Sequence, residues 1–133
     1  MPIDHRLDVE RRLVFVVMTG EVTPEEFRAY EDALEASPGY HRSFARLVDC
    51  RGVTRLPTEV EARAIGAVVR ASGDPATPSR RAWVVASPFA YGVARQIQSY
   101  GAGAGVDGMP FLEMGAARGW LGLPTVESPG DAR

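Results

Sequence analysis

The chain has 133 residues, 45% of them hydrophobic and 24% charged, and a formal net charge of −2. These values are typical of one globular domain that buries a core without disulfides or metals. They argue against nucleic-acid binding, because the arginines alternate with acids instead of forming a basic stripe. No apolar stretch of the sequence reaches the roughly 20 residues of a membrane helix. The single cysteine and the charged N-terminus predict a cytoplasmic protein.

The first part of the chain predicts a β-hairpin. Residues 3–10 and 12–20 both have strand composition, and the short interval between them indicates an antiparallel pair. The first strand contains the stretch HRLDVE and is a candidate edge strand. Because an exposed strand edge has to be protected or paired, we expect a homodimer to form through it, with the apolar surface of the later helices as a second route.

A helix is predicted over residues 23–36. Thr23 is its N-cap, Pro24 takes the first helical position, and Glu26 closes a capping box. The residues expected to face the core recur at helical spacing and are Phe27, Tyr30 and Leu34.

The central segment predicts a strand, a loop and a second helix. Residues 43–50 suit a strand, residues 51–57 suit a loop, and Thr58 with Glu61 forms a second capping box. The expected buried face of this helix consists of Val60, Ala64, Ile65, Val68, Val69 and Ser72.

The last third of the chain predicts two further strands and two further helices. Residues 80–87 form an almost continuously apolar strand, as expected for one covered on both faces. We expect a helix over 88–100, a short strand over 110–114, a short helix over 116–122 and a frayed tail over 124–133. The residues of the 88–100 helix expected to point inward are Phe89, Val93 and Ile97.

The glycine-rich stretch GAGAGVDG contains the pattern G-x-G-x-x-G at Gly103, Gly105 and Gly108. A dinucleotide site requires this pattern to follow a strand and to open a helix. Here it follows a helix and precedes a strand, so we interpret it as a connector and predict no cofactor. The two histidines and one cysteine are scattered, and we predict no metal site.

The element order is therefore ββαβαβαβα. Strands that alternate with helices predict an α/β fold with a mixed, mostly parallel, five-stranded sheet flanked by about four helices. We expect a single domain over residues 1–123.

Three stretches, VMTGEVTPEEFRAYEDALEA, LVDCRGVT and FLEMGAARGWL, resemble the SpoIIAA-like, or STAS-like, family of small bacterial proteins. In order, they are similar to that family's hydrophobic strand with a Gly and acidic turn and a helix, to its strand that ends in Asp with a short Gly-containing loop, and to its terminal strand with an Ala-rich turn that ends in Trp-Leu. The resemblance implies a STAS-like fold with helices on both sides of the sheet, similar also to CRAL-TRIO lipid-transfer domains. It implies no catalytic residues.

The resemblance also raises the question of a phosphorylation switch. In anti-sigma-factor antagonists a phosphorylatable serine, preceded by aspartate, opens the helix after the third strand. In this chain the pair falls on Pro57 and Thr58, so the aspartate is missing and threonine replaces serine. A helix N-terminus favours a phosphate, but Glu59 and Glu61 would repel it. We expect Thr58 to cap its helix, with the switch as the alternative.

The residues around the end of the third predicted strand form a candidate interaction or switch region. It comprises Asp49, Arg51, Gly52, Arg55 and Thr58. The carboxyl end of a strand is where open α/β sheets place ligand sites. The structural alternative is that Asp49 braces the turn through Gly52.

Other reactive or charged residues have simpler interpretations. Cys50 has no histidine partner, because His5 and His41 lie elsewhere in the predicted fold, and we interpret it as a small buried apolar residue. Arg80 and Arg81 could join the arginines of the interaction region and attract an anion. Pairing with surface carboxylates is the interpretation that we favour.

The sequence thus favours a non-enzymatic regulatory or protein-interaction domain of the STAS-like kind, since no nucleophile, base and acid converge in it. The alternative is a carrier of a small apolar or lipid-like ligand, held in a pocket between the sheet and the helices. The candidate pocket residues are Val68, Val93 and Ile97. The expected partners are accordingly a protein or a small apolar molecule.

Overall fold

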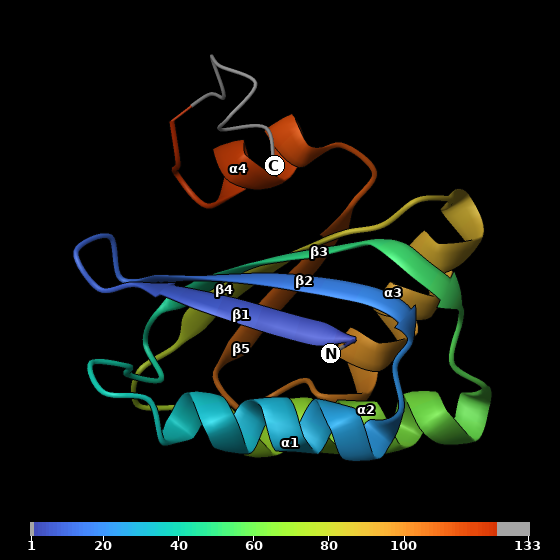
Figure 1. The fold of residues 1–133 in the computed structure, drawn as a ribbon, viewed down its shortest axis with the longest axis horizontal. Helices are drawn as coiled ribbons and strands as arrows, with labels where there is room; N and C mark the ends of the chain where they lie inside the picture. Colours follow the sequence, from blue (N-terminus) through green and yellow to red (C-terminus); the bar gives the residue numbers. More distant parts are fainter. Residues whose placement is uncertain (1, 125–133) are drawn as a thin grey trace.

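A five-stranded mixed sheet and four helices form the fold of residues 2–124, the part of the chain that the computed structural model describes (Figure 1). The elements in chain order are β1 (Ile3–Asp8), β2 (Leu13–Glu21), α1 (Pro24–Glu35), β3 (Ala45–Arg55), α2 (Glu59–Ala71), β4 (Ser79–Val84), α3 (Pro88–Tyr100), β5 (Val106–Phe111) and α4 (Met114–Trp120). The predicted order ββαβαβαβα is confirmed. Except for Pro124, the tail predicted over 124–133 lies outside the described residues.

The sheet order is β1-β2-β3-β4-β5, in which β1 and β2 are antiparallel and all other neighbours are parallel. Each parallel connection steps to the adjacent strand in the same direction. Because such crossovers are right-handed, α1, α2 and α3 all lie on one face of the sheet. The short helix α4 packs on the other face, against β4 and β5, as Figure 1 shows. The expectation of helices on both sides is therefore confirmed.

The helix-covered face contains the larger core. Side chains alternate along each strand, so every second residue of β2, β3 and β4 points toward α1, α2 and α3. Val16, Val48 and Trp83 are buried there. The opposite face has a smaller core under α4, which includes Leu47 and Val84. Beyond α4 this second face is open, and Val17 on β2 is 46% exposed.

The third strand is longer than predicted, because residues 51–55 continue β3 instead of forming a loop. The β2–β3 ladder absorbs extra residues at two register shifts, one of which pairs Thr19 with Gly52. Such bulges bend and twist a strand without ending it. A Cβ atom at Gly52 would lie 2.9 Å from Cγ2 of Thr19, so any other residue at this position would have to displace the Thr19 side chain.

The prediction of burial is wrong for two residues. Val60 is 78% exposed and Phe89 is 73% exposed. Both lie in the first turn of their helices, which extends beyond the carboxyl edge of the sheet, and burial begins at Ala62 and Ala90. Ile65, Val68, Val69 and Ser72 are buried as predicted, whereas Ala64 and Val93 are partly buried.

The glycine-rich connector is shorter than predicted, since β5 begins at Val106, and α4 begins at Met114. Between residues 2 and 124, the helices all lack the length and continuous apolar character that crossing a membrane would require.

Candidate functional site

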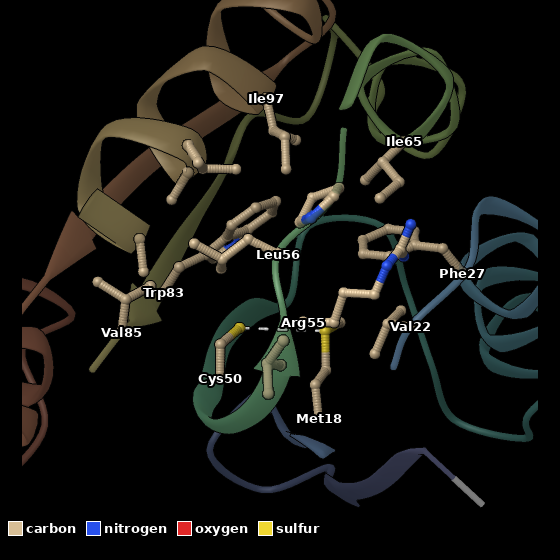
Figure 2. Close-up of a pocket in the computed structure, with 15 residues that line it drawn as sticks. Met18, Val22, Phe27, Cys50, Arg55, Leu56, Ile65, Trp83, Val85 and Ile97 are labelled. Atoms are coloured by element: carbon tan, nitrogen blue, oxygen red, sulfur yellow. Dashed lines mark hydrogen bonds between the residues drawn. The ribbon is translucent and has the colours of Figure 1, made fainter. Parts of the chain in front are cut away.

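A pocket lies between the sheet and helices α1, α2 and α3, at the carboxyl ends of β2, β3 and β4 (Figure 2). Its volume is about 70 Å³. The lining residues are Met18, Val22, Phe27, Cys50, Val53, Arg55, Leu56, Pro57, Ile65, Trp83, Val85, Ala90, Val93, Ala94 and Ile97. We call this cavity the apolar pocket, because Arg55 is the only charged residue among them.

The strands supply the floor of the apolar pocket through their helix-facing side chains. Met18 comes from β2, Cys50 from β3 and Trp83 from β4. Figure 2 shows the sulfur atoms of Met18 and Cys50 facing each other, and they are 4.0 Å apart. Sulfur-containing side chains are soft and adaptable, which suits a surface that accommodates different apolar shapes.

The helices supply the roof. On α3 the side chains of Ala90, Ala94 and Ile97 follow the spacing of one helical face and point toward the sheet. Two of these three residues are alanines, and their small side chains leave space between α3 and the strands. Phe27 of α1 and Ile65 of α2 close the remaining sides.

The mouth of the apolar pocket is formed where the chain leaves β3. Residues 55–57 line the pocket and lead directly into Thr58, the N-cap of α2. The Arg55 guanidinium lies 3.2 Å from Oε1 of Glu61. The Thr58 amide and the Arg55 guanidinium together hold the pKa of Glu61 below its usual value. Arg55 is thus a half-exposed hydrogen-bond donor at an otherwise apolar mouth.

The chemistry of the pocket is that of a neutral, apolar environment. Burial, with a smaller contribution from the Asp49 charge, raises the pKa of the Cys50 thiol to about 12. At neutral pH this thiol is therefore protonated and a poor nucleophile. Neither histidine lines the pocket: His5 makes an edge-to-face contact with Tyr30, and His41 hydrogen-bonds to Ser43.

The predicted interaction region is divided between two faces of the sheet. Asp49 and Arg51 form an ion pair of 2.8 Å, and Asp49 borders a separate groove on the open face of the sheet. Burial opposes ionisation of Asp49, but the hydrogen bonds from Arg51 outweigh it and hold the pKa of this carboxyl below its usual value. Arg55 instead lies at the mouth of the apolar pocket. The five residues therefore do not form one site.

Thr58 has the predicted capping geometry. Its Oγ1 accepts a hydrogen bond from the Glu61 amide at 3.2 Å, and its own amide donates to Oε1 of Glu61 at 2.9 Å. The capping box is confirmed. Phosphorylation of Thr58 stays an untested alternative.

Of the predicted pocket residues, Val93 and Ile97 line the apolar pocket, and Val68 does not. Val68 lies further toward the amino end of the sheet, beside Ser72. Sequence reasoning missed the contributions of Met18, Phe27, Cys50 and Trp83. The strand residues among them lie near the carboxyl ends of predicted strands, on the side that faces the helices. That position was the signal that could have identified them as pocket residues.

A buried charged network at the opposite, amino end of the strands was also missed. Arg46 donates to both carboxylate oxygens of Glu31, at 2.5 and 2.9 Å, and to the hydroxyls of Tyr30 and Tyr40, each at 2.8 Å. Arg81, interpreted from the sequence as a surface residue, is only 2% exposed. We call these five residues the buried charged network.

Two arginines share one carboxylate in this network. Arg81 lies 3.6 Å from Oε2 of Glu31 and donates to Oγ of Ser72 at 2.8 Å. Burial and the neighbouring Arg46 lower the pKa of Arg81 to about 10. Burial raises the pKa of Tyr30 to about 12, so this phenol is neutral and can accept from Arg46.

The described residues, 2–124, contain no cluster of three His, Cys, Asp or Glu side chains that could hold a metal ion. No protein-family model matches the sequence, and no curated protein matches it. The sheet order and the connections between its strands fit a STAS-like fold.

Proposed function

We propose that the chain is a non-enzymatic STAS-like domain that binds a small apolar molecule in the apolar pocket. The observation that carries this proposal is the composition of the cavity: fourteen of its fifteen lining residues are apolar or sulfur-containing. Protein cores are packed as densely as organic crystals, and they rarely leave a void larger than a water molecule. A concave, mostly apolar pocket with a single polar group is the usual form of a small-molecule site.

The position of the pocket supports binding. It lies at the carboxyl edge of the parallel strands, where open α/β sheets take their ligands. Ligand sites generally combine an apolar lining with a few polar groups that fix orientation. Arg55 is the candidate for that role, since its guanidinium could donate to an acceptor at the exposed end of the ligand. The volume of about 70 Å³ is about half that of the roughly 150 Å³ cavity that holds benzene, so the pocket suits a short alkyl segment or one part of a ring that extends through the open mouth.

A regulatory role is a second candidate, and the path of the chain favours it. Leu56 and Pro57 line the apolar pocket, and the next residue, Thr58, caps α2 at the protein surface. A ligand that displaces Leu56 would therefore change the exposed start of α2. In this form the regulatory domain expected from the STAS-like resemblance and the ligand carrier expected from the CRAL-TRIO similarity are two uses of one pocket.

The experiment is a ligand titration read through Trp83, which lines the apolar pocket. The Trp120→Phe variant leaves Trp83 as the only tryptophan of the sequence. We expect a saturable change of its fluorescence with toluene, and a tighter one with octanoate, whose carboxylate can reach Arg55. Arg55→Gln should remove the preference for octanoate and keep the response to toluene.

The matched controls are two Ala→Leu substitutions. Ala94→Leu fills the apolar pocket from α3, whereas Ala67→Leu adds the same atoms to an exposed position of α2. The response should disappear in the first variant and persist in the second. Equal responses in both variants, or none in the parent protein, would contradict the proposal.

A further inference from the structure

The two edges of the sheet differ in their capacity to accept another strand. At one edge, β5 contains Pro110, which has no N–H to donate. At the other edge, β1 pairs with β2 in an unbroken register from Ile3 to Asp8 and contains neither proline nor glycine. Among the described residues β1 has β2 as its only neighbouring strand. The β1 edge is therefore regular and open to pairing.

The phase of the β1–β2 ladder identifies the free backbone groups of β1. The Thr19 amide donates to the Pro2 carbonyl at 2.8 Å, so residue 2 directs its backbone toward β2. In an antiparallel ladder this direction alternates from residue to residue. The N–H and C=O groups of Ile3, His5 and Leu7 consequently point away from β2, toward the open edge.

We propose that a second copy of the chain occupies this edge, with the two β1 strands antiparallel and His5 on the two-fold axis. In this register Ile3 of one copy lies opposite Leu7 of the other, and each His5 lies opposite its counterpart. Ile3, His5 and Leu7 of each copy then use their free N–H and C=O groups, which gives six hydrogen bonds between the two β1 strands. The result is a continuous sheet through both copies.

Charge selects this register over its neighbours. The side chains of Asp4 and Arg6 are exposed on the open face of the sheet, and Arg6 is positioned there by stacking on Phe15, 4.9 Å from the ring centre. With His5 on the axis, Asp4 of each copy lies opposite Arg6 of the other, in the closely spaced, non-hydrogen-bonded type of pair. In the two neighbouring registers the two-fold axis passes through residue 4 or residue 6. Asp4 then lies opposite Asp4 of the other copy, or Arg6 lies opposite Arg6. Of these three registers, only the His5-centred one is charge-complementary.

The helix-facing side of β1 provides matching apolar space. A hollow of about 150 Å³ lies beside the edge between β1 and α1. Its lining residues are Pro2, Ile3, His5, Glu26, Ala29, Tyr30 and Ala33. Because Leu7 of the second copy lies opposite Ile3 and on the same face, its side chain covers this hollow. The exposed alanines Ala29 and Ala33 leave room for the neighbouring copy.

The decisive experiment uses two charge reversals, Asp4→Arg and Arg6→Asp, followed by sedimentation equilibrium at low salt and up to about 1 mM protein. The parent chain should dimerise. Each variant alone should dimerise about ten-fold or more weakly, because like charges oppose each other across the axis. The first variant presents two cations along its edge and the second presents two anions, so an equimolar mixture should form a heterodimer at least as tight as the parent.

Two controls make the outcome specific. Arg95→Asp makes the same charge change on the exposed side of α3 and should leave dimerisation unchanged. In a Cys50→Ser background, His5→Cys should form a disulfide between copies on oxidation, since its Cα atoms would be about 5.5 Å apart. Asp4→Cys and Arg6→Cys test the shifted registers and should cross-link poorly.

A parent chain that stays monomeric over this range would overturn the proposal. So would a mixture of the two charge variants that fails to associate, or a cross-link that favours Asp4→Cys or Arg6→Cys. These measurements record association and not ligand binding, so they succeed or fail independently of the proposed function.

Discussion

The two ends of the layer between the sheet and helices α1, α2 and α3 are built in opposite ways. At the amino end of the strands, the buried charged network fills the space with hydrogen-bonded side chains. At the carboxyl end, the apolar pocket leaves about 70 Å³ empty. Helices α1 and α2 border both regions, with Phe27 and Ile65 at the pocket and Glu31 and Ser72 at the network. The difference lies in the side chains, which fill one end with hydrogen-bonded polar groups and line the other end with apolar groups around an open pocket.

The energetic consequences of the two ends also differ. The side chains around the apolar pocket lack packing partners on one side, and a bound apolar molecule would supply the missing contacts. The buried charged network depends on Glu31, because removing this one carboxylate leaves the guanidinium groups of Arg46 and Arg81 buried without an opposite charge.

The largest expected effect is at Glu31, the only carboxylate of the buried charged network. Glu31→Gln leaves Arg46 and Arg81 buried without an opposite charge and should lower the free energy of unfolding by about 3–5 kcal/mol. Glu35→Gln, on the exposed side of the same helix, removes a surface ion pair with Arg42 and should cost less than about 1 kcal/mol. Urea unfolding of both variants tests this difference. Equal losses would contradict a special role for the network.

Ala94→Leu should have a moderate effect of the opposite sign. The added atoms fill the apolar pocket and should raise the free energy of unfolding by about 1 kcal/mol. Ala67→Leu, on the surface of α2, should change it by less than about 0.5 kcal/mol. A loss of stability in Ala94→Leu would indicate that the pocket is already filled when the protein is in solution.

Thr58→Ala should cost about 1 kcal/mol, because it removes the side-chain half of the capping box, and Thr58→Ser should be almost silent. Thr54→Ala, at an exposed position of β3, serves as the control in the same unfolding assay. Stoichiometric phosphate on Thr58, found by mass spectrometry after incubation with lysate and ATP and accompanied by loss of a partner, would instead establish the switch.

The raised pKa of the Cys50 thiol should have the smallest effect on stability at neutral pH. It should have a clear effect on the rate at which the thiol is alkylated. Its folded pKa of about 12 lies above the ordinary value of 9.0, so the fold favours the neutral thiol. This contribution to stability is complete below about pH 9 and is lost as the pH rises toward 12. At pH 9, iodoacetamide should label the folded protein at least about a hundred-fold more slowly than the protein in urea. Comparable rates would contradict a partly buried, neutral thiol.

The fold was largely predictable from the sequence, and the site was not. The capping boxes at Thr23 and Thr58 marked two helix starts correctly. Periodicity failed at Val60 and Phe89, because it identifies an apolar face and not where that face extends past the edge of the sheet. The continuation of β3 past Cys50 depends on bulges that no local pattern specifies.

The charges and the cavity were beyond sequence reasoning for a related reason. Arg46 alternates with apolar residues on the helix-facing side of β3, but its partner Glu31 is fifteen residues away on α1. Only tertiary packing brings the two together. The apolar pocket likewise results from the small sizes of Ala90 and Ala94 opposite a bent strand. Side-chain spacing alone predicts neither.

The most direct test of the apolar pocket is a crystal structure of the protein under xenon pressure, since xenon enters dry apolar cavities. We predict a xenon atom among Met18, Cys50 and Trp83 in the parent protein, and none there in Ala94→Leu. The charged network at the amino end should take up none in either crystal. A parent structure without xenon in the pocket, or with side chains or ordered water occupying that volume, would contradict the proposed ligand site.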